Sequence, residues 1–382
     1  MLEEKDIKKL KQYGIYNIKM LDTLTINSIS AKLSKALEKT LDTYLLDKEN
    51  LFIKISRINM YYADFDEIHI SAKYIPEYKA IFLKQDINIE TLDSSILHEC
   101  IHFLQSHFDE KDNLLSMGLL KKNKFKKDQN VALNEAATQL VASNVMSEKP
   151  SSVTYFDMYF SSPSQDYYPI ETALLKQMMF FTGSYPLFYS TILGNNIFEE
   201  TFKTITSEEV FNFISKNLDN LMFFQDEIAK LYIKKSKQNM PSFLKNYIKK
   251  RIDIVKINIQ NTVLNIQDSI YQNCFNNLLN KVKTLSDCED IKAELSSFSN
   301  LLIQREDEYS YSNYLNFALF VLAEKEKQLN LYNVVLDDNL IIKQDTYLPV
   351  SNKPLLFVKN MFNKFKLFLE VSFKKRLFSK DG

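Results

Sequence analysis

The sequence predicts a mostly helical α+β protein, in which a small mixed sheet is followed by a largely helical C-terminal region. The chain holds only 5 glycines and 8 prolines in 382 residues, and so few breakers favour long helices. Strand-like patterning is confined to about residues 51–83, and beyond Pro150 the apolar spacing is almost wholly helical. A composition of 45% hydrophobic and 25% charged residues excludes wholesale disorder.

The elements expected in the first 150 residues follow from the spacing of apolar side chains. Apolar residues four apart predict the first helix, and runs rich in isoleucine and phenylalanine predict two strands. Thr91 or Asp93 can cap the next helix, and Pro150 stops the last one. The series is a helix over 25–46, strands over 51–62 and 68–83, a helix over 93–107, an exposed lysine-rich excursion over 109–128, and a helix over 130–146.

The rest of the chain is expected to be helical. Helices are predicted over 169–182, 184–193, 207–216, 219–237, 241–283, 287–303 and 312–330, with breaks near Pro163, Pro241 and Pro349. The chain is therefore expected to divide into parts covering residues 1–150, 151–348 and 349–382.

Two histidines four residues apart, His98 and His102, lie in the helix expected over 93–107. Such a pair projects from one helical face, so both imidazoles can reach one ion. Glu99 lies beside that face, where it can take a proton from a water whose pKa zinc lowers to about 7. The motif predicts one Zn²⁺ per chain in a catalytic domain over residues 1–150, with Glu99 as general base. A hydrogen-bonded histidine pair without metal is the other interpretation.

A catalytic zinc site needs a third protein ligand. The metzincin spacing is excluded because Phe108 stands where the third histidine belongs, and His107 has the wrong spacing for the same ion. Asn134-Glu135, in the next helix, resembles the Asn-Glu pair of the gluzincin-type HExxH zinc metallopeptidases. The resemblance covers roughly residues 50–150 and implies Glu135 as the third ligand. An ordinary solvated glutamate is the alternative.

Positions around the ligands are expected to tune the site. Asn134 neighbours the implied ligand in the resembling motif, and Thr138 shares the helical face of Glu135. Gln139 stands where the gluzincins carry an aspartate that orients the first histidine. Its amide oxygen can accept the same N–H bond without the charge, which tunes metal affinity differently. The gap between His102 and Glu135, 33 residues (135 minus 102), is also longer than in thermolysin-like members.

A peptidase also needs groups that hold the substrate. The expected edge strand, which would align a peptide backbone, contains Ile81, Phe82 and Leu83. The donor to the oxyanion is expected from Tyr168 or its neighbour Tyr167, or from His107, although a tyrosine at such a position can equally be packing. Cys100 lies off the ligand face, and a buried apolar role is expected for it.

Net charge, cysteine content and the N-terminal sequence indicate the kind of partner and the cellular compartment to expect. Lysine plus arginine equals aspartate plus glutamate at 48 each, so no global field favours nucleic acid. Three cysteines without a CxxC pair, a charged N-terminus and no long apolar stretch predict a cytoplasmic protein, with non-classical export left open. Residues 353–378 form a basic amphipathic pattern, which predicts either peripheral membrane contact or a terminal helix packed on the helical part.

The function that these features predict is that of a zinc metallopeptidase, which hydrolyses peptide bonds of a protein or peptide substrate. Glu99 is the residue that favours an enzyme, because a structural zinc site needs no such carboxylate. The alternative is a zinc-binding regulatory or interaction protein with a degenerate peptidase site. A helical protein that reaches membranes through its tail is a third hypothesis.

Overall fold

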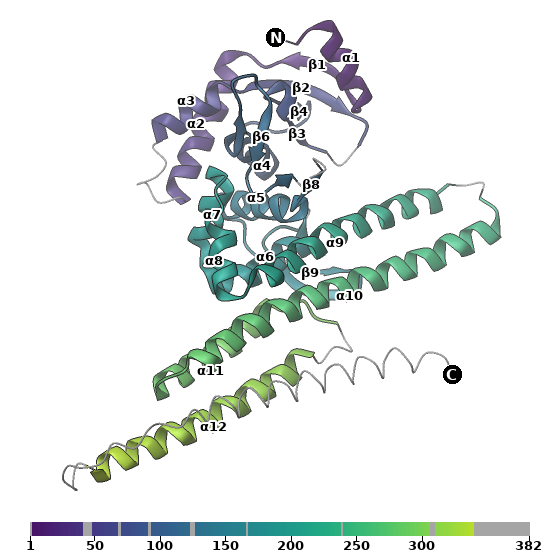
Figure 1. The fold of residues 1–382 in the computed structure, drawn as a ribbon. Coiled ribbons are helices and arrows are strands. Elements are labelled where there is room, and N and C mark those ends of the chain that lie inside the picture. Colours follow the sequence, from purple (N-terminus) through teal and green to yellow (C-terminus); the bar gives the residue numbers. More distant parts are fainter. Residues whose placement is uncertain are drawn as a thin grey trace. The chain divides into compact units, whose positions relative to one another are not determined.

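The computed structural model describes residues 2–40, 48–67, 70–90, 93–122, 127–165, 167–237, 240–305 and 310–339. It confirms the predicted class: a mostly helical α+β chain with a small mixed sheet (Figure 1). The chain forms two compact units, Met1–Lys327 and Gln328–Gly382. The boundary expected at residue 150 remains a prediction, and the one expected at residue 348 lies outside the described residues.

The mixed sheet has the strand order β1-β2-β4-β3. Its strands are β1 (Ile15–Met20), β2 (Asn59–Phe65), β3 (Ala72–Ile75) and β4 (Ala80–Lys84). Strands β2 and β4 are parallel, and the two outer pairs are antiparallel. The short η1 turn (Pro76–Tyr78) joins β3 to β4. Consequently β4 is an interior strand and β3 is an edge of this sheet.

The first strand-like run was predicted wrongly. Its beginning forms α3 (Lys48–Ser56), and only its end enters β2. Leu51 and Ile55, four residues apart, are buried on one helical face, whereas Ile53 is exposed. A short run of apolar residues fits either period, and here packing against α2 (Thr23–Thr40) selects the helix. The helix expected over 25–46 corresponds to α2, and the end of that expected range lies outside the described residues.

Helix α4 (Ser94–Leu104) carries the histidine motif. Asp93 is its N-cap, since the carboxylate accepts a hydrogen bond from Ser95 N at 2.8 Å. The helix ends before the predicted residue 107, because the chain turns into β5 (Ser106–Phe108), which pairs with β6 (Leu114–Met117). The expected excursion over 109–128 thus includes this hairpin and a pairing of β7 (Lys121–Lys122) with β8 (Asp128–Gln129).

Helix α5 (Val131–Val145) follows as predicted, and α4 packs directly on it. Its side chains are buried almost all round, including Asn134, Thr138 and Gln139. Asp219 of α9 (Glu208–Lys235) holds the first turn of α5, since its carboxylate accepts hydrogen bonds from the backbone N–H groups of Asn130 and Ala132, each at 2.9 Å. Helix α5 is therefore held by neighbours on several sides.

The region after Pro150 is less uniformly helical than predicted. It begins with a hairpin of β9 (Ser151–Tyr155) and β10 (Met158–Ser162), in which Met158, Phe160 and Ser162 alternate with exposed residues. Helices α6 (Pro169–Thr182) and α7 (Ser184–Leu193) have the predicted bounds. Helix α8 (Ile197–Ile205) was not predicted. The later elements are α9 (Glu208–Lys235), α10 (Ser242–Lys281), α11 (Leu285–Phe298), η2 (Ser299–Leu301) and α12 (Ser310–Asn339).

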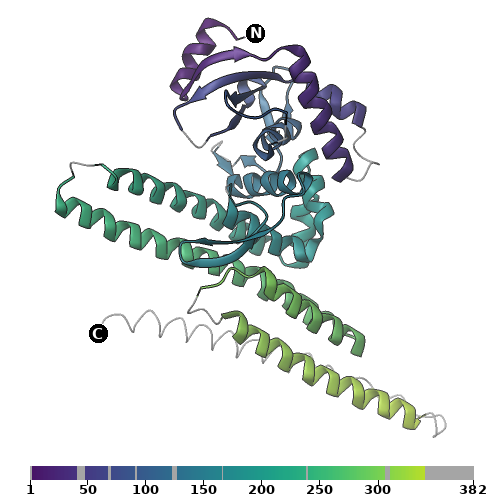
Figure 2. The ribbon, with the colours of Figure 1, turned by 180° about the vertical axis from the view of Figure 1, so that it is seen from behind.

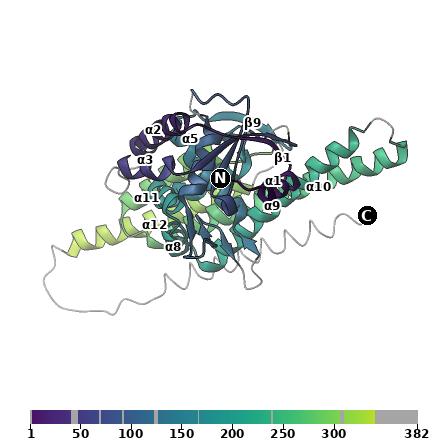
Figure 3. The same cartoon turned by 90° about the horizontal axis from the view of Figure 1, so that it is seen from above.

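Helices α9 and α10 run side by side as a long hairpin, whose far end extends away from the sheet (Figures 2 and 3). Two helices were predicted over 207–237, but the chain forms one, because no proline or glycine interrupts it. Within the described part of the chain, no helix is both long and apolar enough to cross a bilayer. The predicted basic tail over 353–378 lies outside the described residues.

Candidate metal centre

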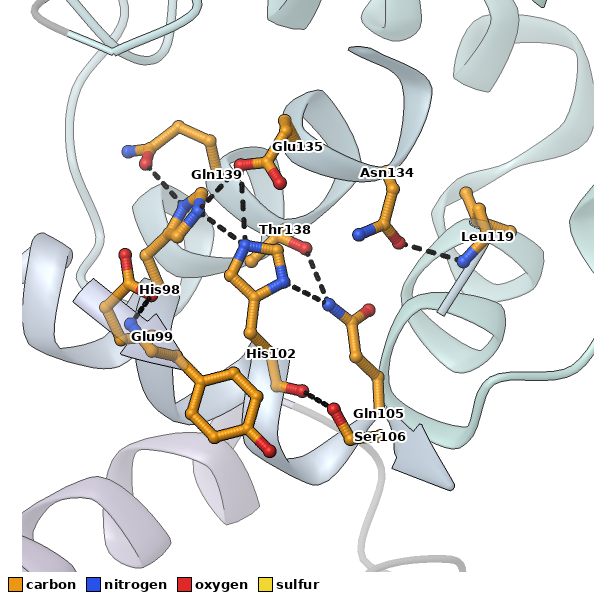
Figure 4. Close-up of polar contacts among 11 residues, drawn as sticks. His98, Glu99, His102, Gln105, Ser106, Leu119, Asn134, Glu135, Thr138 and Gln139 are labelled. Atoms are coloured by element: carbon orange, nitrogen blue, oxygen red, sulfur yellow. Dashed lines mark hydrogen bonds and ion pairs between the residues drawn. The ribbon is translucent and has the colours of Figure 1, made fainter. Parts of the chain in front are cut away.

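Three potential metal ligands meet between α4 and α5. His98 Nε2 and His102 Nε2 lie 2.9 Å apart, and Glu135 Oε2 lies 3.3 Å from the first and 3.4 Å from the second (Figure 4). In a tetrahedral zinc site with bonds of about 2.0–2.1 Å, neighbouring ligand atoms are about 3.3 Å apart. The spacing of the three atoms therefore fits a single Zn²⁺ ion.

The hydrogen-bond partner of His98 determines which nitrogen of its imidazole ring carries the proton. Gln139 Oε1 lies 3.0 Å from His98 Nδ1, and the amide nitrogen of Gln139 is turned toward Ser143 Oγ at 3.2 Å. An amide oxygen only accepts, so His98 Nδ1 carries a proton, and Nε2 is the ring nitrogen left to bind a metal ion. Gln139 thus occupies the orienting position expected for it, as a neutral partner.

Gln105 is the partner of His102, which the sequence reasoning missed. Its side-chain amide lies against His102 Nδ1 at 2.6 Å and against Thr138 Oγ1 at 3.2 Å. With the nitrogen toward the ring, the buried oxygen Gln105 Oε1 has no partner. If the amide is turned by 180°, Gln105 Oε1 accepts a hydrogen bond from the N–H at His102 Nδ1. The lone pair of His102 Nε2 is then available for a cation. The donor set therefore suits a metal.

Asn134 supports the site from the side rather than touching the ligands. Its Oδ1 accepts a hydrogen bond from Leu119 N at 2.8 Å and so ties α5 to the end of the β5–β6 hairpin. Gly118 lies in that turn with a φ of 54°. A Cβ at this position would lie 2.0 Å from Gln105 Oε1 and 2.3 Å from Asn134 Oδ1. Only glycine allows these two amides to pack so closely against the turn.

Electrostatics keep Glu135 charged. Burial by itself would raise the pKa of Glu135, but His102 and His98 outweigh that effect and hold the pKa well below its usual range. The carboxylate side chain is 19% exposed and faces the cleft. Glu135 is therefore an ionised group in contact with both rings, not the solvated glutamate of the alternative interpretation.

Glu99 lies beside the ligands and bonds to the edge of the sheet. Its Oε2 accepts a hydrogen bond from Tyr74 N of β3 at 2.6 Å (Figure 4). Burial raises the pKa of Glu99 to about 7, although His98 and the Tyr74 N–H act in the opposite direction. A carboxylate with such a pKa can both accept and return a proton near neutral pH. Cys100, by contrast, is fully buried, and burial raises the pKa of its thiol.

A cleft of about 470 Å³ opens onto these residues. Its size falls within the range of small-molecule and peptide-side-chain pockets. Residues of α4 and α5 line its floor, and the chain from Ile70 to Tyr74 lines one wall. Glu67, Pro76, Met117, Tyr167, Tyr168 and Met222 complete the lining. The cleft thus joins the ligand cluster to an open strand.

That open strand is β3, which corrects the expectation for residues 80–83. Ile81, Phe82 and Leu83 lie in β4, which pairs with β2 on one side and β3 on the other, and all three side chains are fully buried. Their backbone cannot bind a peptide, because its hydrogen bonds are used within the sheet. The unpaired side of β3 faces the cleft, since Tyr74 N–H donates to Glu99 and not to another strand.

Of the expected oxyanion donors, the tyrosines reach the cleft and His107 does not. The ring of Tyr168 stacks near that of His98, with centroids 6.2 Å apart, at the start of α6. Its backbone has a φ of 50°, which is strained for a tyrosine. Burial and then the Glu135 carboxylate raise the pKa of Tyr168, so its hydroxyl stays protonated and can donate. His107 lies in β5 and contacts Leu193 O at 3.1 Å, outside the cleft lining.

The residues that the sequence reasoning missed carried weak signals. Gln105 stands three residues after His102, at the C-cap of the same helix, and this spacing brings the two side chains together. The position of Tyr74 depends on which strand is the edge, and Met222 reaches the cleft from a helix more than 80 residues away along the chain (222 minus 135 is 87). Neither of these two could be found from local patterns.

Comparison with protein-family models, with curated proteins and with solved structures gave no match.

Proposed function

We propose that the protein is a zinc-dependent metallopeptidase. The observation that carries the proposal is the meeting of His98, His102 and Glu135 in one cleft with Glu99 beside them. A site that only stabilises a fold closes around its metal with four protein ligands, whereas this cluster has three among the described residues and faces a cleft. When bound, zinc would supply Lewis acidity and acidify a water molecule.

Residues of the chain would carry out proton transfer, oxyanion stabilisation and substrate alignment. The Tyr74 N–H holds Glu99 Oε2, which leaves Oε1 to take a proton from a water molecule in the cleft and to pass it to the leaving amine. In this mechanism the protonated Tyr168 hydroxyl, which lines the cleft, would donate to the developing oxyanion. Strand β3 offers an open edge along which an extended peptide can form backbone hydrogen bonds.

The second candidate is a zinc-binding regulatory protein whose peptidase site is degenerate. Its support is the neutral partner of His98, because Gln139 lacks the charge that an aspartate would supply. Both candidates share the metal ligands. They differ in whether Glu99 transfers protons, so the deciding experiment addresses that residue.

The experiment compares the parent protein with the Glu99→Gln variant. Each is loaded with zinc and incubated with a peptide library, and new peptide termini are read by mass spectrometry while elemental analysis reports zinc. We expect equal zinc in both proteins and a loss of cleavage of roughly 10²–10⁴-fold in the variant. Glu148→Gln, an exposed carboxylate at the end of α5, is the matched control and should cleave as the parent does.

Two outcomes contradict the proposal. Undiminished cleavage by Glu99→Gln would refute Glu99 as the base. If the parent holds one zinc per chain and cleaves nothing in the library, the regulatory candidate is favoured instead.

A further inference from the structure

The end of the α9–α10 hairpin concentrates positive charge. Residues 228–252, here called the hairpin tip, contain eight lysines and arginines and no acidic residue, although the whole chain has 48 of each sign. The basic residues are Lys230, Lys234, Lys235, Lys237, Lys245, Lys249, Lys250 and Arg251. Arg251 pairs with Glu227 at 2.7 Å, while none of the seven lysines forms an ion pair with a described residue. The tip therefore presents uncompensated positive charge.

The same tip exposes large apolar side chains. Phe243 is 73% exposed, Ile233 is 66% exposed and Tyr247 is 65% exposed. These exposed residues are not needed to hold the two helices together, because the buried residues Ile248 and Ile252 pack between the helices. A soluble surface rarely gathers such residues without a use for them.

The tip lies well away from the candidate metal centre. Helix α9 meets the rest of the compact unit at Asp219 and Met222, and α10 meets it near Gln260, which donates to Phe156 O at 2.7 Å. Lys235 lies 13 residues beyond Met222 (235 minus 222), which is about 20 Å along a helix. In Figures 1 and 3 this end of the hairpin extends beyond the rest of residues 1–327.

We propose that the hairpin tip docks on the surface of an anionic lipid bilayer. Each lysine near such a surface contributes about 1 kcal/mol of attraction, and exposed aromatic and aliphatic side chains gain by entering the boundary between headgroups and acyl chains. Tyr232 and Tyr247 have the amphipathic rings that favour this depth. The inference is independent of the proposed peptidase activity, since no residue of the tip lines the cleft.

Other occupants fit the tip less well. A second copy of the tip would bring eight like charges against eight, with no acidic residue on either side to compensate. Nucleic acid would use the lysines and could stack on the aromatic rings, but Ile233 and Leu244 have no ring to stack and would stay exposed to water. A lipid surface is the partner that uses both the charges and the aliphatic side chains.

The test is co-sedimentation of the full-length chain with lipid vesicles. Vesicles of phosphatidylcholine and phosphatidylserine in equal amounts should bind the parent, and binding should weaken with salt, while phosphatidylcholine alone should bind little. The variant Lys245→Glu/Lys249→Glu should bind the anionic vesicles at least roughly tenfold more weakly. Phe243→Ser/Tyr247→Ser should also lose roughly tenfold or more.

Matched variants elsewhere in the chain separate docking from general effects. Lys35→Glu/Lys39→Glu changes two exposed lysines of α2 at the same spacing, and Leu24→Ser/Leu115→Ser removes apolar side chains that are 82% and 61% exposed. Both should bind as the parent does. Circular dichroism of all variants checks that each is folded.

The proposal is overturned if the parent does not bind anionic vesicles, or if the two tip variants bind them as strongly as the parent. It is also overturned if the tip variants lose binding to a single-stranded oligonucleotide while keeping vesicle binding, since the tip would then serve nucleic acid.

Discussion

Two helix pairs dominate this molecule, and they use their polar side chains in opposite ways. In α4 and α5 the polar side chains point inward: His98, His102 and Gln139 are buried and bonded to one another. At the far end of α9 and α10, in the hairpin tip, the polar side chains are exposed, and packing between the helices there depends on apolar residues such as Ile228 and Ile252. The first pair therefore encloses the candidate metal centre, and the end of the second presents an exposed surface.

Because of this difference, substitutions in the two helix pairs should affect different properties of the protein. A buried polar group is expensive to leave without its partner, so changes in the α4–α5 pair should alter metal binding, activity or stability. Exposed side chains at the end of a long hairpin have no such partners, so changes there should leave the fold intact.

Removal of a ligand should have the largest effect. His98→Ala is expected to lower zinc affinity on the order of 10²–10³-fold, because a binding free energy of about 10–16 kcal/mol is shared among few ligands. His107→Ala is the matched control, since His107 contacts Leu193 O outside the cleft. Competition with a zinc-binding dye measures both. Tight zinc binding by His98→Ala would rule out the assigned ligand set.

A methyl group at Gly118 should destabilise the fold around the ligands. Gly118→Ala places a Cβ 2.0 Å from Gln105 Oε1 at a φ of 54°, and a cost of about 2–4 kcal/mol in the free energy of unfolding is expected. Gly14→Ala is the control: its φ is 74°, but its Cβ would meet only the exposed Asp66 side chain at 3.0 Å, so about 1 kcal/mol is expected. Urea titration measures the two costs, and equal costs would contradict the packing described.

The Tyr168 hydroxyl should matter for cleavage and not for zinc. If it donates to the oxyanion, Tyr168→Phe lowers the cleavage rate by roughly 10²-fold and leaves zinc content unchanged. Tyr167→Phe, whose hydroxyl lies 3.4 Å from Ser71 Oγ instead, should have a much smaller effect. Rates on one cleaved peptide, with zinc measured in parallel, compare the two variants. Equal rates would remove Tyr168 from the proposed mechanism.

The two glutamine partners of the histidines should tune metal affinity. Gln105→Ala and Gln139→Ala are each expected to lower zinc affinity by about 10- to 100-fold, because each leaves a ligand ring without its orienting partner. Gln177→Ala removes an equally buried glutamine that bonds to Gln267 and Leu301 instead. That control should lower stability and leave zinc affinity unchanged. A zinc affinity that falls equally in all three variants would indicate general destabilisation.

Charge reversal at the hairpin tip should have the smallest effect on the fold. Lys245→Glu/Lys249→Glu is expected to change the free energy of unfolding by no more than about 0.5 kcal/mol, because both side chains are exposed. Thermal unfolding followed by circular dichroism measures the change. A large loss of stability would mean that these lysines make stabilising contacts, which would contradict their description as exposed side chains.

Local periodicity was enough to predict α4, α5, α6 and α7. The last two helices have the predicted bounds, since Pro169 begins one and glycines follow both. The motif of His98, Glu99 and His102 could be predicted because the side chains of one helix keep a fixed spacing. The pairing of Gln139 with His98 followed from the resemblance, which placed a partner four residues after Glu135.

The sequence was ambiguous where the spacing of apolar residues fits both the helical and the strand period. The run around Leu51 and Ile55 fitted a strand as well as the helix that forms, and the alternation of Met158 and Phe160 was overlooked among helical patterns. Short elements hold too few residues to favour one period, so their neighbours in the fold decide.

By itself, the sequence determined the ligand-bearing helix and the acidic residue beside it, because helical geometry is local. Only the tertiary structure decided which strand borders the cleft, since strand order depends on pairings between distant segments: β4 lies inside the sheet and β3 at its edge. It also decided that Gln105 holds His102 and that the hairpin tip stands clear of the rest of its unit. Those facts depend on packing between elements, which no local pattern encodes.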